Sequence, residues 1–250
     1  MSVPVDLRDL FASWPYDPSN NARIIRAGDD RDVLQVRQPV GIEQYELVGR
    51  PDGCRPHNHE TALDYQLDRL AKARAEGKAD TFRLSHGECV ELFDEGVLYY
   101  YRYLNLFQLK EWDRVIRDTT RNSKLFDFVN RHAKREEDRH HLEQWRPYII
   151  RMTAVARAMM EIDRDAYEVA LGFVRHAIDA IEALPEMDNP TFAFERERSL
   201  TALRELADHI EETRPVSEVE RVERALEQAV EAQEFERAAK LRDRLRNLRK

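Results

Sequence analysis

The densest group of potential metal ligands in the sequence is CRPHNHE, residues 54–60. It places Cys54, His57 and His59 within six residues, and thiolate and imidazole are ligands that zinc accepts readily. No second pair of ligands such as C-x-x-C appears elsewhere in the chain. We therefore interpret these side chains as ordinary loop residues and expect no metal and no other cofactor, with zinc binding as the alternative.

A second group, REEDRHH, contains Glu137-x-x-His140, which is half of the motif that holds a di-iron centre between helices. That chemistry needs a second Glu-x-x-His and two further glutamates, and the sequence has no second copy. We interpret the segment as a solvated helix face. On it, His140 and His141 are expected to pair with Glu136 and Glu137 one turn away.

Aromatic residues gather at Trp14, Tyr16 and Tyr99–Tyr103, where they could line a ligand groove. At helical spacing, however, aromatic side chains usually pack in the core, because they bury the largest area. The chain has no glycine-rich phosphate loop and no nucleophile elbow. We expect no catalytic residues and no enzyme, although residues 1–213 leave open an uncharacterised metal-binding or ligand-binding protein.

The composition favours amphipathic helices. Of the 250 residues, 42% are hydrophobic and 35% are charged, and glycine is scarce. A net charge of −8 gives the whole chain no electrostatic footprint for nucleic acid. Two cysteines do not make a disulfide framework, no segment resembles a signal peptide, and none reaches the ~18 apolar residues of a membrane span. We expect a soluble, cytoplasmic protein.

The secondary structure that must position these side chains begins with a short amphipathic turn over residues 6–11. A loop marked by Pro15 and Pro18 follows it. Three β-rich runs follow, separated by residues 28–30 and by Gly41. Their spacing predicts a three-stranded antiparallel meander. Because so small a sheet is unstable alone, a helix must cover one of its faces.

From residue 60 the apolar period becomes helical. The first helix ends at Gly77, and Ser85-x-x-Glu88 has the form of a capping box that starts the next. Residues 97–107 are apolar nearly all round, which predicts a buried central helix. Later helices are expected at residues 110–132, 136–161, 164–184 and 194–212, with Asn189-Pro190 opening the last.

Parts of this region look like the helix pairs of tetratricopeptide (TPR) proteins, but the 34-residue period is absent. The predicted fold class is therefore α+β, mostly α: a small N-terminal antiparallel β-meander, a central helical bundle with TPR-like helix pairs, and a C-terminal helical hairpin. The predicted domains are residues 1–58 (loop and meander), 59–213 (bundle) and 214–250 (hairpin).

The predicted hairpin follows Pro215, and Ser217-x-x-Glu220 repeats the capping-box form. Residues 232–234 form the bend between two apolar stripes, and Phe235 at the bend is expected to fill the gap between the helices. Residues 218–236 carry seven acidic residues and two arginines, a net charge of −5, whereas residues 237–250 carry seven basic residues and one acidic residue, a net charge of +6. Opposite charges favour the antiparallel pairing of the two helices.

The segment LEQAVEAQEFERAAKLRDRL, residues 226–245, resembles the UVR motif, named for the UvrB and UvrC repair proteins. The matching features are Leu226, Ala229, Glu234-Phe235-Glu236, Ala238-Ala239, Leu241-Arg242-Asp243 and Leu245. In that family the motif is a helical hairpin that pairs with a second UVR hairpin or with another protein. It occurs in the repair proteins, in class C Clp ATPases and in activators of bacterial protein-arginine kinase. The resemblance implies protein–protein contact and does not imply catalysis.

Two short helices share only one line of contact, so some of their apolar side chains must await a partner. The predicted partner-binding residues are Leu226, Val230, Phe235, Ala238, Ala239, Leu241, Arg242, Leu245 and Leu248. We expect a non-enzymatic bacterial adaptor whose hairpin engages another protein: a Clp ATPase, a protein-arginine kinase, another UVR-containing protein or its own copy.

The alternative function is an accessory factor of nucleotide excision repair, recruited through the same hairpin. The basic second helix offers Arg237, Lys240, Arg244 and Arg246 to phosphate groups. Because the acidic first helix largely cancels that field, we do not expect direct binding of nucleic acid, and we expect no membrane contact.

Overall fold

In the computed structural model, which describes residues 6–215 and 218–248, the β-rich runs form the predicted antiparallel meander. The strands are β1 (Ala22–Arg26), β2 (Asp32–Gln38) and β3 (Gly41–Glu46), paired in that order. Asp30, with φ of 63°, takes the left-handed conformation in the first turn. Before the sheet lies a short helix, α1 (Arg8–Ser13), which begins two residues later than predicted.

The bundle that follows is built from helices whose starts are set by local signals. Ser85 and Glu88 form the predicted capping box at the start of α3, and Thr61 caps α2 by accepting from the backbone N–H of Asp64. Short 3₁₀ turns lie at Pro56–Asn58 and Ala79–Thr81. The α-helices are α2 (Ala62–Ala75), α3 (His86–Gln108), α4 (Trp112–His132), α5 (Glu136–Glu143), α6 (Arg146–Ile162), α7 (Tyr167–Glu182) and α8 (Pro190–Thr213).

The single helix predicted at residues 136–161 is wrong, because the chain divides it into α5 and α6. Pro147 is the reason. It has no backbone N–H, and its ring would collide with the carbonyl of Glu143 in a continuous helix. At the start of α6, where the amide would have no partner in any case, the same proline is favourable.

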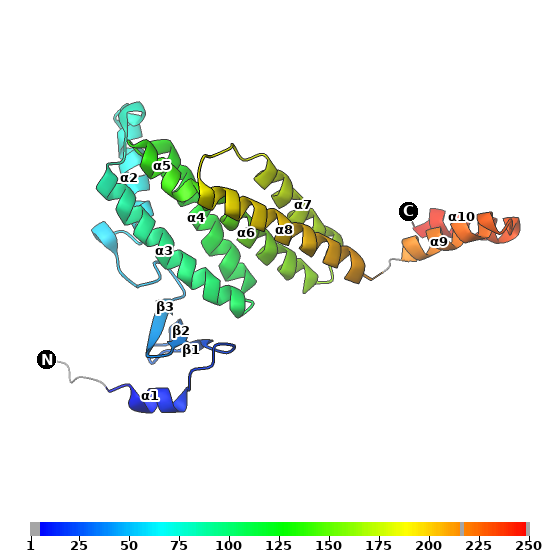
Figure 1. The fold of residues 1–250 in the computed structure, drawn as a ribbon, viewed down its shortest axis with the longest axis horizontal. Coiled ribbons are helices and arrows are strands. Elements are labelled where there is room, and N and C mark those ends of the chain that lie inside the picture. Colours follow the sequence, from blue (N-terminus) through cyan, green and yellow to red (C-terminus); the bar gives the residue numbers. More distant parts are fainter. Residues whose placement is uncertain (1–5, 216–217, 249–250) are drawn as a thin grey trace. The chain divides into compact units, whose positions relative to one another are not determined.

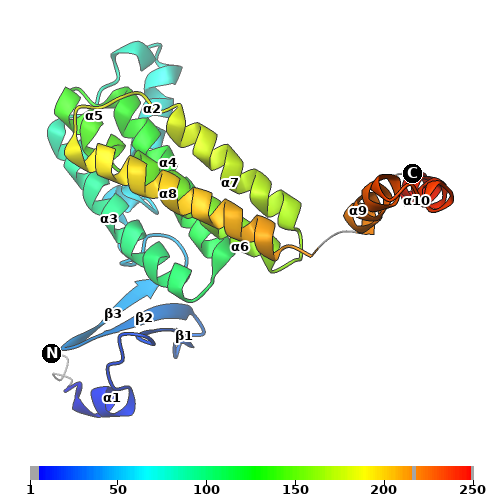
Figure 2. The ribbon, with the colours of Figure 1, turned by 45° about the vertical axis from the view of Figure 1, so that its right-hand side comes forward.

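The sheet packs against one end of the bundle, as Figures 1 and 2 show. Its buried side chains meet Tyr103 and Leu106 of α3, Trp112 and Val115 of α4, and Met152 of α6. A second apolar cluster joins α2, α3, α4 and α5. The sheet therefore has the helical cover that its small size requires.

Two buried ionic sites join these elements. Arg102 of α3 and Asp118 of α4 form a bidentate pair at 2.7 and 2.8 Å with side chains 1% exposed. Arg102 also donates to the carbonyl of Glu46, the last residue of β3, and to that of Gly49. Glu95 of α3 accepts from the first backbone amides of α2, whose N–H groups have no partner within the helix. These contacts fix the sheet and α2 on α3.

The prediction that residues 97–107 are buried all round is wrong for one face. Tyr99, Tyr103 and Leu106 are buried, whereas Val97 and Tyr101 are exposed. The cause is that the sheet, α2, α4 and α5 contact α3 and leave part of its circumference uncovered.

The chain divides into two compact units, Met1–Ala207 and Asp208–Lys250. The second contains α9 (Glu218–Glu231) and α10 (Phe235–Leu248), which pack on each other. The predicted domain boundaries at residues 58 and 213 stay predictions. Among the described residues, no helix combines the length and apolarity needed to cross a bilayer.

Candidate protein-binding hairpin

The bend between α9 and α10 lies at the predicted residues, 232–234. The amide of Gln233 donates to the carbonyl of Val230 at 3.0 Å, and the amide of Glu234 donates to that of Ala229 at 2.8 Å. These two bonds form a Schellman motif, in which Gln233 takes the left-handed conformation with φ of 55°. The bend is thus closed by backbone bonds, and the helices turn back on each other.

Gln233 occupies the position where glycine is preferred, because a side chain in the left-handed region costs about 1 kcal/mol. We expect Gln233→Gly to stabilise the hairpin by about that amount. Native-state hydrogen exchange should then show roughly fivefold greater protection of the α9 and α10 amides. Gln228→Gly, inside α9, is the matched control, and it should reduce protection because glycine is unfavourable in a helix interior. Equal effects of the two variants would contradict the assignment of the bend.

One face of each helix forms the seam of the hairpin. Val222 and Ala229 of α9 and Ala238 of α10 are buried, and the predicted residues Leu226, Leu241 and Leu245 are half-buried. Ala238 is small enough to let the helix axes approach closely. Four of the nine predicted partner-binding residues (Leu226, Ala238, Leu241 and Leu245) thus belong to this inward set.

A different face of α10 is left to solvent. Phe235 is 71% exposed, so the prediction that it fills the gap between the helices is wrong. At 100° per residue, Ala239, Arg242 and Arg246 lie within about 40° of Phe235 around the helix axis, and all of them are exposed. The seam side of α10 is marked by Ala238 and Leu245, and Phe235 lies about 60° and 80° from them around the helix axis. Its side chain therefore points out of the seam.

On α9 the exposed apolar residue is Val230, at 54% exposure, and Glu223 and Glu227 share its side of the helix. Leu248 near the end of α10 is also exposed. We define the outer face of the hairpin as Val230, Phe235, Ala239 and Arg242. Leu248 lies about 140° from Phe235 around the axis of α10 and is not part of this face. The outer face contains four of the five predicted partner-binding residues that lie outside the seam, and Leu248 is the fifth.

The charges of the hairpin lie mostly in solvent. Arg237 pairs with Glu234 at 2.9 Å and Arg242 approaches Asp243 at 3.7 Å, and both contacts join residues of the same segment. Exposed pairs of this kind contribute little to stability. The predicted capping box at Ser217 lies outside the described residues.

The candidate zinc ligands do not converge. His57 Nε2 lies 3.0 Å from a carboxylate oxygen of Glu91, and His59 Nδ1 bonds to the carbonyl of His57 at 2.8 Å. Cys54 is exposed, and within the described ranges no three His, Cys, Asp or Glu side chains are grouped to hold a metal. Cys89 is buried under α2, and burial raises the pKa of its thiol to about 12, so it is unreactive at neutral pH.

The Glu137-x-x-His140 segment lies on α5. His140 approaches Glu136 at 3.9 Å, as predicted, and Glu137 pairs with Arg135. The prediction for His141 is wrong: its ring stacks on Phe93 of α3 at 4.2 Å, because this side of α5 faces the bundle.

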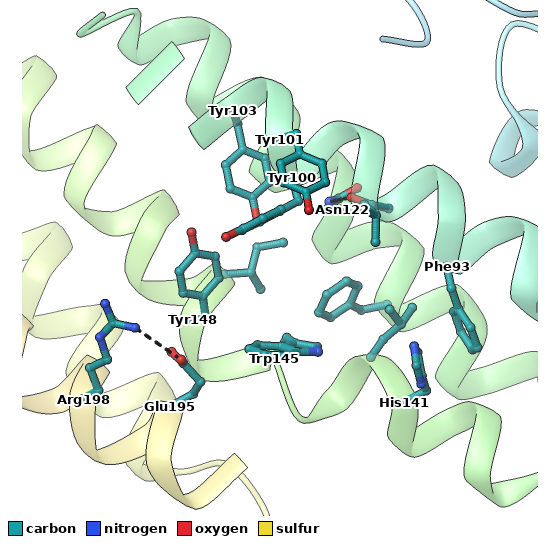
Figure 3. A pocket seen from close by; sticks show the side chains of 15 residues that line it. Phe93, Tyr100, Tyr101, Tyr103, Asn122, His141, Trp145, Tyr148, Glu195 and Arg198 are labelled. Atoms are coloured by element: carbon teal, nitrogen blue, oxygen red, sulfur yellow. Dashed lines mark hydrogen bonds and ion pairs between the residues drawn. The ribbon is translucent and has the colours of Figure 1, made fainter. Parts of the chain in front are cut away.

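The aromatic residues divide between two environments. Trp14 lies under the guanidinium of Arg23, 3.8 Å from the ring centre, and Tyr16 is exposed. Tyr99 and Tyr103 are in the core as predicted, and Tyr103 together with Tyr100 and Tyr101 also lines a pocket of about 450 Å³ in the bundle, shown in Figure 3. Three further residues of the pocket wall were not among the predicted site residues. Trp145 directly precedes α6, Tyr148 lies on α6, and Glu195 lies on α8.

Comparison with protein families matches residues 217–250 to the UvrB/uvrC motif, which confirms the predicted resemblance. This motif is a protein–protein interaction element. No curated protein and no solved structure matches the chain. The C-terminal hairpin, with its inward seam and its outer face, is therefore the part of the chain that matches the UVR motif.

Proposed function

We propose that the protein is a non-enzymatic adaptor whose hairpin binds a partner protein through its outer face. The observation that carries this proposal is the exposure of Phe235 and Val230 at the bend. Val230 lies near the end of α9 and Phe235 at the start of α10, and large apolar side chains on both sides of one bend are costly to leave in water. Each contributes about 1.5–3 kcal/mol when a partner buries it fully.

The charge pattern supports a helical partner of similar design. The side of α9 that carries Val230 is acidic, whereas Arg242 and Arg246 make the side of α10 that carries Phe235 basic. A second hairpin with the same division of charge can set its basic helix against α9 and its acidic helix against α10. A UVR hairpin in another protein, or in a second copy of this chain, satisfies both the apolar and the ionic requirements.

Among partner classes, we propose a Clp ATPase or a protein-arginine kinase system, in which UVR hairpins also occur. In this arrangement the bundle recognises one client and the hairpin engages the other protein. The sheet and bundle would then supply the specificity of the adaptor, and the hairpin would supply its attachment.

A capture experiment tests the proposal. The full chain and a variant that lacks residues 214–250 are immobilised, and the proteins retained from a cell extract are identified. We expect at least one protein to be retained by the full chain alone, while circular dichroism shows that the shortened chain keeps its other helices. Identical sets of retained proteins would contradict the adaptor role, and capture of an excision-repair nuclease would move the assignment to an accessory of DNA repair.

A further inference from the structure

The pocket in the bundle lies between α3, α4, α5, α6 and α8, and its lining residues fall between positions 93 and 198, before the hairpin begins. Its volume of about 450 Å³ falls in the range of sites for small molecules, ~300–1,000 Å³. Figure 3 shows tyrosines of α3 on one side, Tyr148 and Trp145 opposite them, and Glu195 and Arg198 at one edge.

The walls suit a flat aromatic ligand. Tyr100 lies 5.2 Å from Tyr101 and 5.9 Å from Tyr148 between ring centres. Tyr101 and Trp145 are both exposed although they line the cavity. The tyrosine rings already pack on one another, so a further ring adds on their cavity side, where it would bury surface of Tyr101 and Trp145 that water now contacts.

Glu195 is the polar group that distinguishes this cavity from an ordinary packing defect. The residue is only 5% exposed, and its Oε2 atom has no hydrogen-bond partner within the part of the chain that the structure describes. A buried carboxylate oxygen without a donor is costly. The pocket wall therefore includes an acceptor without a donor, which a ligand with an N–H or O–H group satisfies when the Glu195 side chain turns toward the cavity.

The charges around Glu195 decide which kind of donor fits. Arg198 Nη1 lies 3.5 Å from Oε1, and Arg151 Nη2 lies 3.9 Å from Oε2. Two guanidinium groups already compensate one carboxylate, so a cationic ligand would meet net positive charge. An anionic ligand would be repelled by the unpartnered carboxylate oxygen of Glu195. A neutral donor avoids both penalties.

We propose that this pocket binds a neutral aromatic or heteroaromatic small molecule whose N–H or O–H group donates to Oε2 of Glu195. The ring packs among Tyr100, Tyr148 and Trp145. This site is independent of the hairpin, so either assignment can fail without the other.

The test uses three probes that share an indole ring and differ in the charge of the side chain: tryptophol (neutral), tryptamine (cationic) and indole-3-acetate (anionic). Each is titrated to millimolar concentration into the full chain, with the indole N–H signals followed by two-dimensional NMR. Trp145 lines the pocket, whereas Trp14 and Trp112 do not, and they serve as internal references. We expect tryptophol to shift the Trp145 signal alone and to bind at least threefold more tightly than either charged probe.

Two variants locate the contact. Glu195→Gln keeps the shape of the side chain but removes its charge, and it should weaken tryptophol binding at least fivefold. Tyr101→Ala, at the exposed mouth, should weaken it severalfold without unfolding the chain, and Tyr16→Ala is the matched control with no effect. No shift of Trp145 with any probe would overturn the proposal, as would tighter binding of tryptamine or indole-3-acetate than of tryptophol, or unchanged affinity in Glu195→Gln.

Discussion

Replacing Phe235 with aspartate is expected to weaken partner binding at least a hundredfold while the hairpin stays folded. The side chain is 71% exposed in the free protein, so its loss costs the fold little. In the complex the change removes about 1.5–3 kcal/mol of apolar burial and adds an unpaired carboxylate to the interface. A hundredfold loss corresponds to about 2.7 kcal/mol, which is within reach of these two effects together.

Isothermal titration calorimetry with the captured partner measures this effect. Phe194→Asp is the matched control, because Phe194 is also a helical phenylalanine and is 61% exposed, but lies on α8. Its affinity for the partner should equal that of the unaltered chain. If Phe235→Asp bound as tightly as the control, the outer face would be incorrectly assigned.

Removing Asp118 should destabilise the larger unit by about 3–5 kcal/mol, the range seen when one member of a buried ion pair is deleted. Asp118→Ala leaves the guanidinium of Arg102 without a counter-charge at a site where both side chains are 1% exposed. Arg102 also donates to the carbonyls of Glu46 and Gly49. We therefore expect both the sheet and α4 to pack less firmly on α3. Since whole domains are stable by only about 5–15 kcal/mol, the variant is expected to be marginally folded.

Urea denaturation followed by circular dichroism gives the change in the free energy of unfolding. Asp113→Ala is the control, because Asp113 lies on the same helix and is exposed. It should change stability by less than about 1 kcal/mol. Similar losses in the two variants would show that the buried pair contributes no more than a surface charge.

Local signals in the sequence were sufficient for the hairpin and for several helix starts. The capping box at Ser85 joins residues three positions apart, and the bend at residues 232–234 is closed by backbone bonds between residues three and five positions apart. The meander was predictable for the same reason, since glycine and aspartate mark its turns. The UVR motif is equally local, and its family match confirms it.

Contacts between distant segments were not predictable in the same way. Arg102 stands alone as a charge in an apolar run, which signals a buried partner, but nothing local identifies Asp118 on the next helix. The pocket brings together Tyr100, Trp145 and Glu195, whose proximity depends on how α3, α6 and α8 pack. The apolar pattern predicts Phe235 in the seam, because the pattern alone does not distinguish a residue that faces the other helix from one that faces a partner.

Site-specific photocrosslinking tests most directly whether the hairpin binds its partner through the outer face. Phe235 is replaced by p-benzoylphenylalanine, which keeps an aromatic side chain, and the same replacement at Phe194 reports on the bundle. On irradiation in the presence of cell extract, we expect a covalent adduct with a partner protein from position 235 and none with that protein from position 194. An adduct with that protein from position 194 and none from position 235 would contradict it.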